Sequence, residues 1–157
     1  MSAIFYINAY GGSAEMGSEE RSAWIMLVVT IAAYGAYAVV IFTRSASMPL
    51  SEVPYVGAML WSIGGAIAGG ILLNILSGML LMRGTPRKDQ RDREIYRFGE
   101  YTGQAFLVIG GVAALIMAMA EAAHFWIANT IYLAFVLSAA LSSIAKLVAY
   151  RRGLPAW

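Results

Sequence analysis

The chain alternates between long apolar stretches and shorter polar ones. Four stretches are almost free of charged side chains, namely residues 23–43, 54–82, 101–121 and 126–150. A helix of about 20 apolar residues crosses the hydrocarbon layer of a bilayer, and all four stretches reach that length. The pattern therefore predicts an all-α fold, a polytopic transmembrane four-helix bundle embedded in a lipid bilayer.

The polar segments complete the predicted organisation. Residues 1–22 are predicted to form an N-terminal cytoplasmic or interfacial segment, and 151–157 a cytoplasmic tail. Residues 83–100 are predicted to form a charged cytoplasmic loop with a short helix that leads into the third stretch. Asn129 or Thr130 is the predicted N-cap of the last helix, because both side chains accept hydrogen bonds from the first free backbone N–H groups of a helix.

Composition supports a membrane protein and excludes several kinds of site. Hydrophobic residues make up 60% of the 157 residues and charged residues 13%, against about 45–50% and about 25% in soluble domains. The chain has no cysteine and one histidine, so disulfides and thiolate metal sites are excluded, and few nucleophile and base pairs can form. We expect no enzyme activity, no cofactor and no metal. A net charge of +2 gives no basis for nucleic-acid binding.

The basic residues predict an orientation in the membrane. With a cytoplasmic N-terminus, ten of the eleven Lys and Arg residues fall on the cytoplasmic side, and Arg44 alone falls outside. Because Lys and Arg are enriched in cytoplasmic loops, we expect both termini in the cytoplasm. Lys146, in the last turns of the fourth stretch, is expected to extend toward the lipid headgroups.

The second stretch carries the sharpest motif of the chain, which we call the helix-packing ridge. Its members are the small or polar residues at every fourth position, Ala58, Ser62, Ala66, Gly70, Asn74 and Gly78. Small residues let membrane helices approach closely, so the ridge predicts packing within one bundle, with homodimerisation and a ligand path as alternatives. Asn74 is expected to form an interhelical hydrogen bond. Shorter ridges are Gly110, Ala114 and Ala118, and Ala134, Ser138 and Ser142.

Glu121 and His124 form an E-x-x-H spacing near the end of the third stretch. On a helix this spacing places both side chains on one face, as in bundles that hold two metal ions between carboxylates. Those bundles need two such motifs, and this chain has one. We therefore predict an interfacial polar pair, with Glu121 as the candidate proton-sensing group, and no metal site.

The charged segment offers a candidate contact for a partner protein or for anionic lipid headgroups. Its bases are Arg83, Arg87, Lys88 and Arg91. Each base near an anionic membrane surface contributes roughly 1 kcal/mol of attraction. Acidic residues are interspersed with these bases, so a helix face exposed to water is the alternative interpretation.

The segment from Arg91 to Arg97, which reads Arg-Asp-Arg-Glu-Ile-Tyr-Arg, leads into Gly99-Glu-Tyr and an apolar hairpin. It resembles the charged D-x-R-E-I-like stretch that precedes two membrane helices in small uncharacterised four-helix bacterial inner-membrane proteins. The resemblance covers about the last 65 residues and implies a bacterial inner-membrane location, without catalytic residues. Small multidrug transporters differ, because they carry a carboxylate in their first span, whereas residues 23–43 have no charge.

These patterns favour a non-enzymatic structural, accessory or regulatory membrane component that acts through helix packing and its charged loop. Its partner would be another membrane protein or a second copy of the chain. The alternative is a small oligomeric transporter or channel for a neutral or lipophilic solute. A polar cavity lined by Ser62, Asn74 and Ser138 would favour this alternative, and co-purification of a partner would favour the first interpretation.

Overall fold

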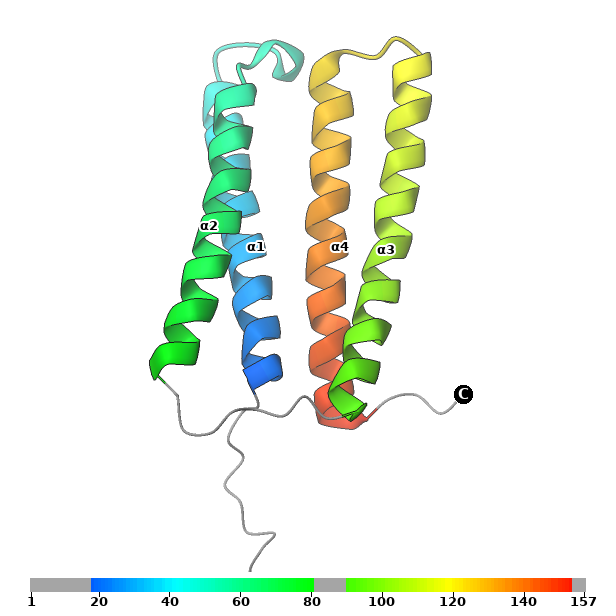
Figure 1. The fold of residues 1–157 in the computed structure, drawn as a ribbon. Coiled ribbons are helices and arrows are strands. Elements are labelled where there is room, and N and C mark those ends of the chain that lie inside the picture. Colours follow the sequence, from blue (N-terminus) through cyan, green and yellow to red (C-terminus); the bar gives the residue numbers. More distant parts are fainter. Residues whose placement is uncertain (1–17, 81–89, 154–157) are drawn as a thin grey trace, which may run out of the picture.

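The computed structural model describes residues 18–80 and 90–153, which form four long α-helices and one short 3-10 helix, with no strand among them (Figure 1). The elements are α1 (Ser18–Arg44), η2 (Leu50–Glu52), α2 (Val56–Leu80), α3 (Gln90–Met119) and α4 (His124–Arg152). All four α-helices are long and apolar enough to cross a membrane. The predicted all-α fold with four membrane-spanning helices is therefore confirmed, and the chain is a multi-pass membrane protein.

Three helices begin earlier than the apolar pattern predicts. α1 begins at Ser18 rather than at residue 23, α3 at Gln90 rather than at residue 101, and α4 at His124 rather than at residue 126. Hydropathy marks where a helix leaves the hydrocarbon layer, but backbone hydrogen bonding continues through residues such as Glu and Arg, which favour helices. From Gln90 onward the charged segment forms the first turns of α3, in agreement with the predicted helix that leads into the third stretch.

The helices pack in the order α2, α1, α4, α3. α4 contacts both α3 and α1, and α1 contacts both α4 and α2. The interface between α3 and α4 is the most extensive, as expected for a hairpin with a short turn. α2 and α3 lie on the outer sides of this row (Figure 1).

The two ends of the bundle differ in charge. At the end that we call the turn end, residues 45–55 join α1 to α2 and residues 120–123 join α3 to α4. At the opposite end, here called the basic end, α1 and α3 begin and α2 and α4 end (bottom of Figure 1). Arg44 is the only described Lys or Arg at the turn end. The described bases in the half near the basic end are Arg21, Arg91, Arg93, Arg97, Lys146, Arg151 and Arg152.

An aromatic core fills the half of the bundle near the turn end. Its buried members come from α1, α4 and the α1–α2 connection, and they are Tyr37, Ile41, Val53, Phe125 and Tyr132. The rings of Tyr37 and Tyr132 meet edge to face with centroids 5.2 Å apart, which is a favourable geometry for aromatic pairs. In this half the central helices α1 and α4 are therefore held together by packed aromatic side chains.

Hydrogen bonds join three helices within the aromatic core. Tyr37 Oη on α1 donates to Asn129 Oδ1 on α4 over 2.6 Å. Ser62 Oγ on α2 lies 2.6 Å from Tyr132 Oη on α4. The predicted N-cap role of Asn129 or Thr130 is wrong, because α4 begins before both residues. Asn129 uses its amide to link helices instead.

Candidate functional site

A cleft of about 600 Å³ opens in the half of the bundle near the basic end. We call it the polar cleft. Its walls come from α1, α3 and α4, and Asn74 is its single lining residue from α2. Its volume falls within the range of about 300–1,000 Å³ that is common for ligand sites. The lining includes the polar side chains of Glu19, Ser22, Asn74, Glu100, Gln104, Ser138, Ser142 and Lys146.

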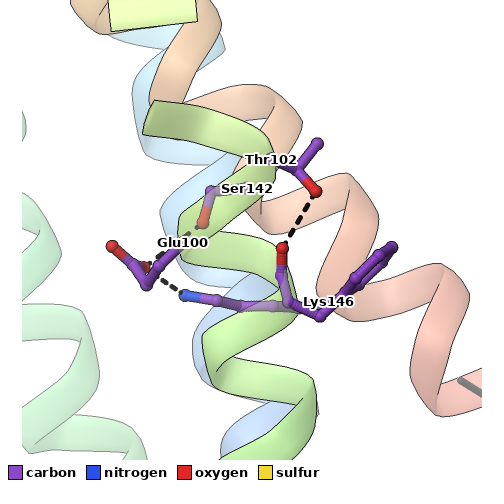
Figure 2. A network of polar contacts seen from close by, with 5 residues as sticks. Glu100, Thr102, Ser142 and Lys146 are labelled. Atoms are coloured by element: carbon purple, nitrogen blue, oxygen red, sulfur yellow. Dashed lines mark hydrogen bonds and ion pairs between the residues drawn. The ribbon is translucent and has the colours of Figure 1, made fainter. Parts of the chain in front are cut away.

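An ion pair lies in the wall of the polar cleft. Lys146 Nζ on α4 donates to Glu100 Oε1 on α3 over 2.8 Å, and Ser142 Oγ donates to the same oxygen over 3.3 Å. Figure 2 shows the Ser142 and Lys146 side chains converging on the Glu100 carboxylate. The Lys146 ammonium also lies 4.1 Å from the centroid of the Tyr96 ring. Lys146 therefore turns toward α3, where it contacts Glu100 and Tyr96.

Close contact between α3 and α4 fixes the position of this wall. A Cβ atom at Gly99 would lie 2.5 Å from Lys146 Cγ, and one at Gly103 would lie 2.6 Å from the Ser138 carbonyl oxygen. Real Cβ atoms essentially never approach other atoms so closely, so a larger residue at either position would force neighbouring atoms of α4 to move. The side chains of Ser138 and Lys146 are thereby held directly against the backbone of α3.

The same tight packing continues beyond the polar cleft. Gly110 is buried against the Ala134 side chain, and an added Cβ there would overlap that methyl group. Gly110 and Ala134 both belong to the short ridges that the sequence shows on the third and fourth stretches. Gly99 and Gly103 were not identified from the sequence, although their GxxxG spacing is the signal that identifies such contacts.

The helix-packing ridge on α2 reaches its neighbours through its polar members. Ser22 Oγ on α1 donates to Asn74 Oδ1 over 2.7 Å, and Asn74 Nδ2 donates to the carbonyl oxygen of Gly70 over 2.8 Å. Ser62 Oγ donates to the Ala33 carbonyl oxygen over 2.8 Å. The interhelical hydrogen bond expected of Asn74 is thus present, with Ser22 as its donor.

The small members of the ridge behave differently. Ala58 and Ala66 are half-buried and Gly70 is buried, but Gly78 is exposed. A Cβ atom at Gly70 or Gly78 would meet no other atom within 4 Å. Close backbone approach at these α2 glycines is therefore not seen within the chain, and the closest helix contact lies between α3 and α4 instead.

Glu121 and His124 do not share a helix face. Glu121 lies in the turn after α3 with a positive φ of 53°, and His124 is the first residue of α4. Both side chains are exposed, and no hydrogen bond joins them in the described part of the chain. The E-x-x-H spacing spans a chain reversal, so the prediction of a same-face pair is wrong. The described residues contain no group of three His, Cys, Asp or Glu side chains that could hold a metal.

The candidate contact for lipid or a partner is described only in part. Arg91 is exposed in the first turn of α3 at the basic end. Arg83, Arg87 and Lys88 lie outside the described residues, as do residues 1–17, 81–82 and 154–157.

Gln104, like Glu19 and Ser22, lines the polar cleft but was not identified from the sequence. It lies one turn beyond Glu100 on α3, in an otherwise apolar stretch, and its side chain is exposed. A single amide has no periodicity, so a search for ridges passes over it. Of the three residues expected to line a polar cavity, Asn74 and Ser138 line this cleft, whereas Ser62 belongs to the aromatic core half.

The polar cleft has no described counterpart from which a role could be transferred. The chain matches no protein-family model, no curated protein and no solved structure. Its function therefore has to be inferred from the geometry and chemistry of the cleft.

Proposed function

We propose that the protein is a small, non-enzymatic membrane transporter that holds a lipophilic solute in the polar cleft. The observation that carries this proposal is the cleft itself, which gathers polar side chains from all four helices in a chain with few charged residues. Sites for solutes in membrane bundles lie between helices, and polar groups there are functional suspects by default. The aromatic core packs between α1 and α4 on the turn-end side of the cleft, so the cleft would load from the basic end.

Polar groups with free hydrogen-bonding capacity support an occupant. The Gln104 amide and the Ser138 hydroxyl line the cleft, and neither has a hydrogen-bond partner among residues 18–80 and 90–153. Gln104 is exposed and Ser138 is half-buried, so both side chains can be reached from the cleft. Water or the polar part of a solute can therefore form hydrogen bonds with them. A helix contact that served structure alone would gain from apolar side chains at these two positions.

We also propose that the protein lies in a bacterial inner membrane with both termini in the cytoplasm. The resemblance of the segment from Arg91 to Arg97 supports the location, and the concentration of bases at the basic end supports the orientation. In that orientation the polar cleft lies in the cytoplasmic half of the bilayer.

Single cysteines can test the cleft, because the chain contains no cysteine of its own. We would introduce Gln104→Cys and Ser138→Cys separately and treat membranes with a charged, membrane-impermeant thiol reagent. Val108→Cys, on the lipid-exposed surface of α3, is the matched control. The two cleft cysteines should react at least tenfold faster than the control, and equal rates would contradict a cleft open to water.

Bound solute is the second readout. Native mass spectrometry of the protein released from its own membrane should show a small-molecule adduct. That adduct should be reduced in the Gln104→Leu variant and retained in Val108→Leu. A protein that carries no adduct and whose cleft cysteines are unreactive would exclude the transporter.

A second candidate function rests on α2. The glycines of this helix meet no atom within 4 Å of an added Cβ, and they are Gly57, Gly64, Gly65, Gly69, Gly70 and Gly78. Small residues that do not serve packing within the chain favour contact with a helix from outside it. This would fit an accessory membrane component that acts through helix packing, with the exposed Arg91 as a contact for lipid headgroups or a partner. Crosslinking from Gly65→Cys, with Val108→Cys as control, tests it, and equal yields would contradict it.

A further inference from the structure

We infer that the polar cleft binds an amphiphile that carries a primary ammonium group. The inference rests on the proposed function and specifies its ligand. Glu100 is the accessible charge of the ion pair, since 54% of its side chain is exposed against 17% for Lys146. A ligand that enters the cleft therefore meets a carboxylate before it meets the ammonium of Lys146.

The hydrogen bonds of Glu100 leave one oxygen available. Both Lys146 Nζ and Ser142 Oγ donate to Oε1, and within the described parts of the chain Oε2 has no hydrogen-bond partner. Lys146 has its charge compensated by this carboxylate and by the face of the Tyr96 ring. Glu100 can thus accept a further hydrogen bond. The cleft lining holds the carboxylates of Glu19 and Glu100 against the ammonium of Lys146, which favours a donor with positive charge.

Two further acceptors lie in the same cleft. Gln104 supplies an amide oxygen and Ser138 a hydroxyl oxygen, and neither has a partner among the described residues. Together with Glu100 Oε2 they offer three acceptor oxygens. A primary ammonium has three N–H donors, as the lysine side chain does. A trimethylammonium group has no N–H donor and could not satisfy any of these oxygens.

Apolar residues continue the cleft toward the middle of the bundle. Each of the helices α1, α3 and α4 contributes a polar and an apolar residue to the lining, and the apolar residue lies about one turn nearer the turn end. The pairs are Ser22 and Met26, Gln104 and Leu107, and Ser138 and Phe135. An amphiphile would therefore place its ammonium toward the basic end and its tail deeper in the bilayer. This polarity selects an alkylammonium or an ethanolamine lipid over a fully polar amine.

Matched probes test the inference. The purified full-length protein would be mixed with dodecylammonium or dodecyltrimethylammonium in one pair of experiments. In the other pair it would be placed in nanodiscs that contain phosphatidylethanolamine or phosphatidylcholine with the same acyl chains. Bound molecules would be counted by native mass spectrometry. We expect about tenfold tighter binding of at least one primary ammonium probe than of its trimethylated counterpart, because charged hydrogen bonds are lost.

The two pairs distinguish the source of the ligand. Preference in the dodecyl pair alone would identify a free amine, and preference in the lipid pair would identify a headgroup. Glu100→Gln should abolish the preference for the primary ammonium probe. Gln104→Leu should reduce this preference and leave the ion pair intact. If Glu100→Gln fails to fold, Gln104→Leu still tests the inference. Glu52→Gln, an exposed carboxylate at the turn end, should keep the wild-type preference.

Failure of the inference can be separated from failure of the proposed function. Equal binding of primary and trimethylated probes by the wild type would overturn the inference, and so would a preference that survives in both cleft variants. Equal binding that is lost in Gln104→Leu would still support a solute site. Absence of any bound probe, with unreactive cleft cysteines, would overturn both.

Discussion

Tyr37 on α1 and Asn129 on α4 share a 2.6 Å hydrogen bond in the half of the bundle near the turn end, between Tyr37 Oη and Asn129 Oδ1. Asn129 Nδ2 also donates to the carbonyl oxygen of Phe125 over 2.8 Å. The amide is thus held by its own helix while its oxygen receives the tyrosine hydroxyl. This bond joins the two central helices in the half of the bundle that does not contain the polar cleft. It therefore helps to hold α1 and α4 together where the cleft does not interrupt their packing.

Tyr37→Phe should destabilise the protein by about 0.6–2 kcal/mol, the range for a hydrogen bond between membrane helices. The substitution keeps the ring that packs against Tyr132 and removes only the hydroxyl, which leaves Asn129 Oδ1 without its donor. Unfolding in mixed micelles of sodium dodecyl sulfate and a mild detergent measures the difference. Tyr101→Phe, at a side chain that is 73% exposed, should unfold like the wild type. Equal stability of the Tyr37→Phe variant and the wild type would show that this bond contributes nothing.

Gly110→Ala should destabilise the protein more than Gly70→Ala. The new methyl group at residue 110 would overlap Ala134, whereas the one at residue 70 would enter open space. Overpacking of a close contact costs about 1–3 kcal/mol. The same unfolding assay compares the two variants, which make an identical chemical change in two membrane helices. A larger loss at Gly70 would restore the ridge on α2 as the main packing surface.

The four helices could be predicted because length and apolar content decide whether a segment can span a bilayer. Their ends could not, because Glu19 and Arg91 favour helix outside the hydrocarbon layer as well. The turn between the last two helices was expected between residues 121 and 126, and it lies at residues 120–123. The E-x-x-H spacing was nevertheless interpreted as if Glu121 and His124 belonged to one helix, although the turn comes between them.

The polar cleft could be predicted only in part. Asn74 and Ser138 are polar residues within apolar stretches and could be identified as candidates. Glu100 and Lys146 lie near the polar ends of two different helices, and the sequence did not indicate that they form a pair. Their meeting depends on how far α3 and α4 slide along each other, which is set by the contacts of Gly99 and Gly103. Such a register is a property of two packed helices, and the residues of either one alone do not define it.

A double-mutant cycle should give the Lys146 and Glu100 pair a coupling energy of about 0.5–1 kcal/mol. The pair is short, at 2.8 Å, but half of the Glu100 side chain is exposed, and exposed ion pairs are weak. The variants are Lys146→Met, Glu100→Gln and their combination. Arg151 and Glu20, 3.8 Å apart with Arg151 65% exposed, form the control pair, for which we expect no measurable coupling. A larger coupling in the control pair would contradict this ranking.

Cysteine labelling in intact cells should show which side of the membrane the polar cleft faces. Ser47 is exposed at the turn end and Arg152 at the basic end, so Ser47→Cys and Arg152→Cys report on opposite sides. With the basic end in the cytoplasm, an impermeant maleimide should label the cysteine at residue 47 in intact cells, but the one at residue 152 only after the membrane is opened. The cysteine-free parent should stay unlabelled. The reverse pattern would place the Lys146 and Glu100 pair in the outer half of the bilayer, where a solute would enter from outside the cell.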